Sequence, residues 1–142
     1  PGEIYARKGL AELKPIIKRC FVIMPSENEV KLLTGRGWKE GAELLLKEGA
    51  WMIAVKLGKK GCYVSDGRQN HIVPPQETKV VDTTGAGDAW DAGFLYGLTK
   101  KKDLYECGRL GNFVALRCIE KVGARTGLPY AHDLEGLLGL LS

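Results

Sequence analysis

The residues best suited to chemistry lie in one glycine-rich segment, DTTGAGDAWDAGF, at residues 82–94. Its loop, Gly85-Ala86-Gly87, comes directly before residues with a helical pattern. Small side chains there would leave the backbone N–H groups of the helix start open to a ligand, and such a position favours a phosphate or a developing negative charge. Asp88 follows the loop and brings a carboxylate that can accept a proton from a hydroxyl group.

Three interpretations of this loop compete on the residues alone. A dinucleotide-binding fingerprint, G-x-G-x-x-G, would need a third glycine where Trp90 stands, and a Walker A loop would need the G-K-[ST] sequence, which the chain lacks. The third interpretation is a structural turn with an aspartate near a helix start. Asp82, Thr83 and Thr84 place further polar oxygens beside the loop, which favours a binding role over a structural turn.

An α/β fold is predicted to position the loop. Short apolar runs predict buried, parallel and central strands at Phe21–Met24 and Trp51–Lys56, and Asp66-Gly67 predicts a hairpin. Helical patterns occur at residues 3–19, 26–35 and 38–48, from the loop to about residue 98, at residues 103–122 and after residue 133. Helices that alternate with short strands predict a three-layer α/β/α architecture with a mostly parallel sheet.

The helix that follows the loop has a face of small residues, Ala89, Gly93 and Gly97, and a face of large ones that includes Trp90 and Phe94. The small face predicts close packing on the sheet, and the large face is expected to fill the core. This packing would hold the helix start rigidly, as electrostatic stabilisation of a reaction requires.

Composition excludes several functional classes. The 142 residues are 44% hydrophobic and 27% charged, which argues against disorder, and no apolar run approaches the roughly 20 residues of a membrane helix. The net charge of +4 comes from scattered basic residues, so it suits a small anionic ligand better than nucleic acid. Four cysteines without a C-x-x-C pair, and only two histidines, predict reduced thiols in a cytoplasmic protein rather than a zinc site or disulfides.

Residues 82–94 resemble the C-terminal signature of the ribokinase-like (PfkB) carbohydrate kinases, D-T-T-G-A-G-D-x-F-x-A-G-F, with Trp90 in place of the usual Phe. Other segments of the chain resemble further family motifs in the same order. Residues 25–29 and 33–35 resemble the motifs P-N-x-x-E and L-T-G, and residues 56–61 resemble T-L-G-x-x-G. Asn112 and Gly123-Ala124 resemble the helix and the loop that lie beside the adenine base in the family. The resemblance covers nearly the whole chain, but only the C-terminal half of such a kinase. Residues 1–142 are therefore expected to form a single domain, the ATP-binding and catalytic part of a longer sugar kinase.

The resemblance implies ATP-dependent phosphorylation of a sugar hydroxyl. Asp88 would be the catalytic base, and the amides of Gly85, Ala86 and Gly87 would form the anion hole. The implied contacts to ATP and Mg²⁺ are Ser26, Glu29, Lys56, Leu57, Gly58, Lys59, Lys60, Gly61, Gly87 and Asn112. Many family members also bind a monovalent cation such as K⁺, and the matching positions are Asp82, Thr84, Cys118, Lys121, Gly123 and Gly127.

Alternatives remain open for several of these residues. Ser26-x-x-Glu29 is also the pattern of a helix capping box, Asn112 could face solvent, and Lys59 and Lys60 could be solvated surface residues. A catalytically silent nucleotide-binding module is the alternative function, although Asp88 favours the enzyme.

The partner is expected to be a small sugar, bound largely by the missing N-terminal half, with no nucleic acid or membrane. This chain alone is expected to bind nucleotide weakly and to have no turnover. An apolar face left uncovered on it would favour self-association, for example as a homodimer.

Overall fold

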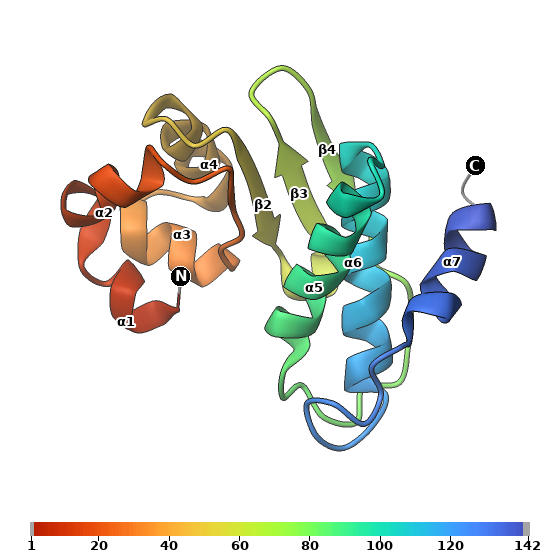
Figure 1. Ribbon diagram of the computed structural model, residues 1–142. Helices are drawn as coiled ribbons and strands as arrows, with labels where there is room; N and C mark the ends of the chain where they lie inside the picture. Colours follow the sequence, from red (N-terminus) through yellow and green to blue (C-terminus); the bar gives the residue numbers. More distant parts are fainter. Residues whose placement is uncertain (1, 141–142) are drawn as a thin grey trace. The chain divides into compact units, whose positions relative to one another are not determined.

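The computed structural model describes residues 2–140, which form two compact units divided between Val73 and Pro74 (Figure 1). The N-terminal unit contains α1 (Glu3–Ala6), α2 (Gly9–Ile17), β1 (Val22–Ile23), α3 (Glu27–Thr34), α4 (Trp38–Lys47), β2 (Met52–Lys56), the short helix η1 (Gly58–Lys60), β3 (Cys62–Ser65) and β4 (Asn70–Val73). The C-terminal unit contains α5 (Ala86–Thr99), α6 (Leu104–Ile119) and α7 (Ala131–Leu140). The α/β class is confirmed, while the single domain over residues 1–142 stays a prediction.

The sheet of the N-terminal unit is mixed, which corrects the prediction of a mostly parallel sheet. The strand order is β1-β2-β3-β4; β1 and β2 are parallel, whereas β2 with β3 and β3 with β4 are antiparallel. The link from β2 to β3 is too short for a crossover helix, so these strands must run antiparallel. The predicted turn joins β3 and β4, where Gly67 has φ +81° and the Asp66 carboxylate accepts N–H bonds from Arg68 and Gln69, both at 2.9 Å. Strand β2 is central as predicted, but β1 is the end strand among the residues described.

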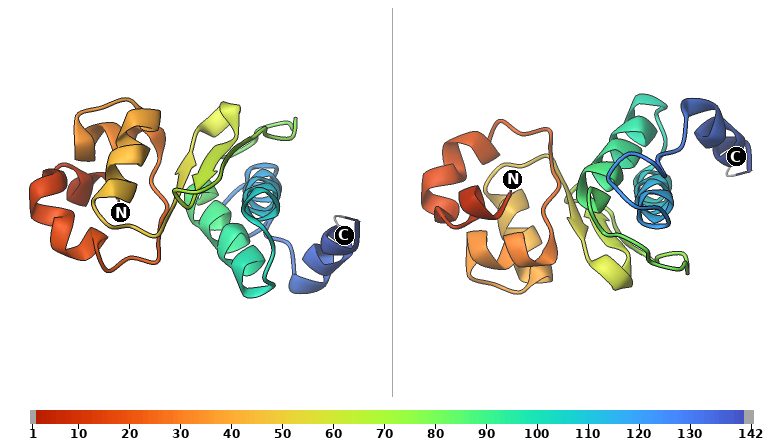
Figure 2. Two further views of the ribbon diagram at one scale, coloured as in Figure 1. Left: turned by 90° about the horizontal axis from the view of Figure 1, so that it is seen from above. Right: turned by 90° about the horizontal axis from the view of Figure 1, so that it is seen from below.

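Helices α1 to α4 lie together beside β1 and β2 and share one apolar core with them (Figure 2). Ile53 and Val55, two residues apart on β2, belong to this core together with Val30 of α3 and Leu45 of α4. All four side chains are fully buried. The single helix predicted for residues 3–19 is instead two helices, because the chain turns after α1 and Gly9 takes a φ of +82° at the start of α2.

The long helices α5 and α6 of the C-terminal unit run side by side, and glycines make their approach close (Figure 1). A Cβ atom at Gly93 would lie 2.6 Å from the carbonyl oxygen of Leu110, and one at Gly97 would lie 2.9 Å from the sulfur of Cys107. The small face of α5 thus packs on α6, whereas the sequence predicted packing on the sheet. A glycine face fits a neighbouring helix as well as a sheet, so the pattern alone does not identify its partner.

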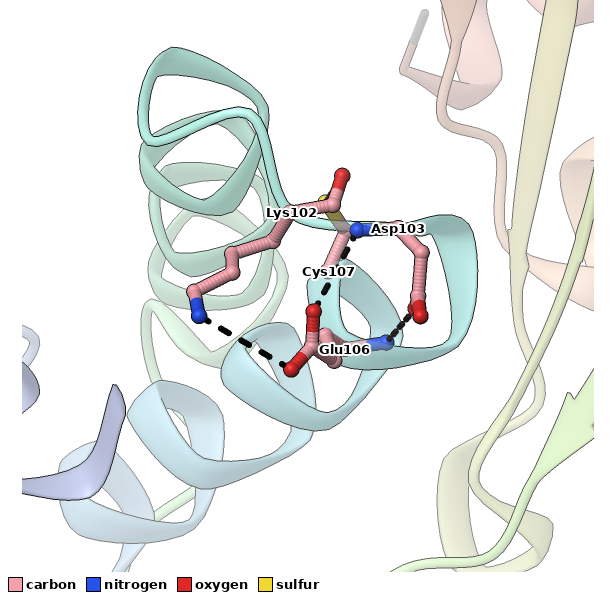
Figure 3. Close-up of polar contacts among 4 residues, drawn as sticks. All are labelled: Lys102, Asp103, Glu106 and Cys107. Atoms are coloured by element: carbon pink, nitrogen blue, oxygen red, sulfur yellow. Dashed lines mark hydrogen bonds and ion pairs between the residues drawn. The ribbon is translucent and has the colours of Figure 1, made fainter. Parts of the chain in front are cut away.

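The start of α6 is fixed by a capping box (Figure 3). The Asp103 carboxylate accepts the backbone N–H of Glu106 at 2.8 Å, and the Glu106 carboxylate accepts the N–H of Asp103 at 3.4 Å. Lys102 lies 3.8 Å from the same Glu106 carboxylate, and the Cys107 thiol donates to the Lys102 carbonyl at 3.5 Å. Unpaired N–H groups of the helix start are thereby satisfied.

The four cysteines are free thiols, as predicted. Cys62, Cys107 and Cys118 are buried, and Cys20 is half-buried. Burial raises the pKa of Cys62 and of Cys107 to about 12, which keeps both thiols protonated and unreactive. None of the helices within residues 2–140 has the length and apolar character needed to cross a membrane.

Candidate active site

The glycine loop begins helix α5, as the sequence predicted. Gly85 is the N-cap residue with φ +78° and ψ 0°, and its carbonyl accepts the N–H of Ala89 at 2.9 Å. A Cβ atom at Gly85 would lie 2.6 Å from the Cβ of Ala124, which leaves no room for a side chain. The positive φ and this close contact both require glycine at the position. Asp88 lies in the first turn with its side chain exposed. The amides of this first turn lack acceptors inside the helix; that of Ala86 donates to the Thr83 carbonyl at 3.2 Å, and those that follow it can bind an anion next to the Asp88 carboxylate.

Asp82 ties the beginning of the loop to the chain after α6. One carboxylate oxygen accepts the backbone N–H of Gly123 at 2.8 Å and the other accepts that of Thr84 at 2.9 Å. The backbone N–H groups of Val81 and Asp82 also donate to the Ile119 carbonyl, at 2.8 and 3.2 Å. The bonds from Gly123 and Thr84 stabilise the carboxylate and hold the pKa of Asp82 below its usual range.

Loss of this carboxylate is expected to change how stability depends on pH. Because the pKa of Asp82 is lower in the folded than in the unfolded chain, its contribution is present above about pH 3.9 and disappears as the pH falls through the lowered value. We expect Asp82→Asn to lower the free energy of unfolding at pH 7, and the deficit to shrink towards pH 3. Urea unfolding at several pH values measures this, with Glu135→Gln, a change at an exposed residue of α7, as a control. A deficit that does not vary with pH would contradict the interpretation.

The six residues predicted to surround a monovalent cation lie close together in the C-terminal unit. The Cys118 thiol donates to the carbonyls of Thr84 and Ala124, each at 3.5 Å, and the N–H of Lys121 donates to the Cys118 carbonyl at 3.4 Å. Gly123 binds Asp82, and a Cβ at Gly127 would overlap the carbonyl oxygen of Arg117. These contacts surround the loop with backbone oxygens.

This donor set fits a hard cation and not a transition metal. Burial, and then the Asp82 charge, raise the pKa of Cys118, so its sulfur is a thiol rather than a thiolate ligand. Within residues 2–140, no group of three His, Cys, Asp or Glu side chains is arranged to hold a metal ion. Carbonyl oxygens are the remaining donors, and such oxygens suit a hard cation.

Ser26 and Glu29 form the capping box that the sequence offered as an alternative to a nucleotide contact. Ser26 Oγ accepts the backbone N–H of Glu29 at 3.2 Å, and the Glu29 carboxylate accepts that of Ser26 at 2.8 Å. Capping therefore engages both side chains at the start of α3. It does not exclude ligand binding, because the same helix start lines a pocket.

Ser26→Ala is expected to remove this cap and to lower the free energy of unfolding by about 1 kcal/mol. Ser26→Asp should keep most of the stability, because aspartate is also a good N-cap residue. Urea unfolding of the two variants beside the parent measures the difference. Equal stability of the alanine variant and the parent would show that the capping bond contributes nothing.

An open pocket of about 520 Å³ lies at this helix start in the N-terminal unit. It is lined by Ser26, Lys56, Leu57 and Gly58, all predicted nucleotide contacts, together with Glu27, Asn28, Lys31, Gly37 and Trp38. Predicted contacts outside this lining include Gly61, with φ +88°, whose carbonyl accepts the N–H of Leu57 at 2.9 Å. Lys59 is exposed, and exposed Lys60 pairs with Glu27 at 3.4 Å, as expected for solvated surface residues.

Asn112 is half-buried in the middle of α6 and faces α5. Its Oδ1 accepts the indole N–H of Trp90 at 2.9 Å, and its Nδ2 donates to the carbonyl of Pro74 at 3.0 Å. Neither sequence interpretation, an adenine contact or a solvent-facing amide, included these partners. Trp90 was the residue in the sequence that could have indicated this hydrogen bond, because a buried indole N–H needs an acceptor.

The chain matches the family model described as pfkB family carbohydrate kinase over residues 4–131. It therefore belongs to the PfkB family of carbohydrate kinases, as its sequence segments indicated. An uncharacterized sugar kinase from Archaeoglobus fulgidus is 50% identical over 133 residues, which cover 94% of this chain and 53% of that protein.

Solved structures confirm the ribokinase-like fold. Adenosine kinase from Sinorhizobium meliloti aligns with a TM-score of 0.85 and 28% identity over 95% of this chain and 42% of that one. A double mutant of fructokinase from Vibrio cholerae O395, described as bound to fructose, ADP and potassium ion, aligns with a TM-score of 0.79 and 29% identity over 91% and 44% of the two chains. The chain thus spans about half the length of these relatives.

Proposed function

We propose that this chain is the nucleotide-binding and catalytic part of a kinase that transfers the γ-phosphoryl group of ATP to a hydroxyl of a sugar or nucleoside. The observation that carries the proposal is the loop Gly85–Asp88, which places the start of helix α5 beside an exposed carboxylate in a chain of the PfkB family. Phosphoryl transfer depends on positioning and on stabilisation of charge, and this loop supplies both.

Each part of the loop has its own role in the proposed reaction. The amides of Gly85, Ala86 and Gly87 bind the transferred phosphoryl group through the positive end of α5. The Asp88 carboxylate orients the acceptor hydroxyl and takes its proton as the bond to phosphorus forms.

The N-terminal unit would contribute contacts to the nucleotide from the pocket at the start of α3 and from the segment 56–61. Glu29 would hold Mg²⁺ in its carboxylate network, and the ion would neutralise phosphate charge. The carbonyls around Cys118 would hold a monovalent cation beside the loop, in line with the potassium ion in the fructokinase structure.

The acceptor class is tested with the full-length protein. We expect ADP formation from MgATP to require one acceptor from a panel that includes ribose, fructose, fructose 6-phosphate, 2-keto-3-deoxygluconate, cytidine and adenosine. Residues 1–142 alone should bind MgATP weakly in calorimetry and form no sugar phosphate, because they span about half of a related kinase. Tight nucleotide binding by the full-length protein without acceptor-dependent ADP formation would favour the silent binding module.

A further inference from the structure

Buried Trp90 and half-buried Asn112 form a hydrogen-bonded pair between α5 and α6. The indole N–H donates to Asn112 Oδ1 at 2.9 Å, and Asn112 Nδ2 donates to the Pro74 carbonyl at 3.0 Å. Trp90 is only 4% exposed, and its ring stacks on that of Phe94 with centroids 5.2 Å apart. The buried indole partly shelters its hydrogen bond from water, and such a bond is stronger than one that is fully exposed.

The surface of α6 is shaped to receive the indole ring. A Cβ atom at Gly111 would lie 2.6 Å from Cε2 of Trp90, so the ring rests directly on the backbone of the residue that precedes Asn112. The ring cannot move toward α6 and cannot turn without breaking its bond to the amide. Trp90 is therefore held by contact on its face and by a hydrogen bond at its edge.

The catalytic loop lies between this pair and a second attachment. Asp82 binds the N–H of Gly123 at the beginning of the segment, and Trp90 binds Asn112 at its end. Asp88 is two residues before Trp90 in the same helix. A rotation or slide of the first turn of α5 would move both the loop amides and the Asp88 carboxylate, and the two attachments oppose such a movement.

We propose that Trp90 and Asn112 are positioning residues, whose indole–amide hydrogen bond fixes the first turn of α5 and with it the Asp88 carboxylate and the loop amides. The proposal rests on the proposed kinase function. It assigns the Asn112 amide to Trp90 and Pro74 instead of to the nucleotide base. The pair then acts on the rate of phosphoryl transfer and not on the choice between nucleotides.

Kinetics of the full-length protein separate these two roles. Trp90→Phe keeps an aromatic ring on Gly111 but deletes the N–H donor, and it should lower kcat roughly three- to tenfold, the equivalent of one modest hydrogen bond. The same loss is expected with ATP and with GTP, and the KM for ATP should stay within about twofold because the nucleotide contacts remain. Asn112→Leu should give the same pattern, and the double variant should lose no more than either single one.

Two further variants serve as controls. Trp51→Phe changes an exposed tryptophan of the N-terminal unit and should leave kcat unchanged. Asn112→Asp keeps an acceptor for the indole and should retain more activity than Asn112→Leu. The hydrogen bond itself is followed without any activity measurement, through the indole ¹⁵N–H resonance that Trp90→Phe removes. This resonance should shift in Asn112→Leu and stay in place in Trp51→Phe.

Distinct results would overturn the proposal. If Asn112→Leu raised the KM for ATP tenfold or more but left GTP unaffected, Asn112 would be a residue that reads the base. Unchanged kcat in both Trp90→Phe and Asn112→Leu, or an indole resonance indifferent to Asn112→Leu, would also overturn it. Absence of acceptor-dependent turnover in an unaltered protein would contradict the proposed function, and the positioning role with it, while the resonance shift would still confirm the hydrogen bond.

Discussion

Asp88→Asn in the full-length protein is expected to lower kcat by roughly 10²- to 10⁴-fold, the usual contribution of a general base. Asparagine keeps the volume of the side chain in the first turn of α5, but it cannot accept the proton of the acceptor hydroxyl. The affinity for ATP should change little, because backbone amides bind the phosphates in the proposed site. A coupled assay for ADP and calorimetry with MgATP measure the two quantities.

Asp91→Asn is the matched control for this change. Like Asp88→Asn, this variant removes one negative charge from α5, but at a residue about one turn further along the helix. The kcat of the Asp91→Asn variant should stay within a few-fold of that of the parent. Turnover of Asp88→Asn within a few-fold of the parent, on the same acceptor, would mean that Asp88 is not the base.

Gly85→Ala is expected to damage both stability and activity. Alanine at φ +78° costs about 1–2 kcal/mol, and the contact of its Cβ with Ala124, at 2.6 Å, adds about 1–3 kcal/mol. We expect the free energy of unfolding to fall by about 2–5 kcal/mol. The kcat should fall at least about tenfold, because a displaced helix start loses the orientation of its amides.

Two variants separate the backbone strain from the steric overlap. Gly67→Ala has nearly the same backbone angle, φ +81°, but its Cβ would have no neighbour within 4 Å, so it should show only the strain. Adding Ala124→Gly to Gly85→Ala removes the overlapping methyl group and should restore part of the stability. If Gly85→Ala were no less stable than Gly67→Ala, the close approach of Ala124 would not constrain the loop.

Features set by residues near one another in sequence were predicted well. The capping pattern of Ser26 and Glu29, the hairpin at Asp66-Gly67 and the helix start after Gly85 all depend on neighbours a few residues away, and all three are present. The motif in residues 82–94 likewise placed the candidate catalytic residues on one helix start. Local chemistry of this kind is visible in the sequence because the interacting groups are also adjacent along the chain.

Features that depend on distant partners were predicted less well. The small face of α5 packs on α6, and Asn112 meets Trp90, 22 residues earlier, and Pro74, 38 residues earlier. The parallel pairing of β1 with β2 was predicted, but the antiparallel pairing of β2 with β3 was not, because apolar runs report burial and not the direction of a neighbouring strand. The hydrophobic pattern of a helix or strand identifies its buried face, but only the folded structure shows which other element packs against that face.

The hydrogen bond between Asp82 and Gly123 spans 41 residues, whereas the close glycine contacts of α5 with α6 join residues such as Gly93 and Leu110 across a short turn. Closing a long loop costs more chain entropy than closing a short one. During folding, the two helices are therefore expected to pair first and the proposed catalytic loop to become ordered last. Partial unfolding would follow the reverse order, so mild denaturant should abolish catalysis before it reduces the helical signal in circular dichroism.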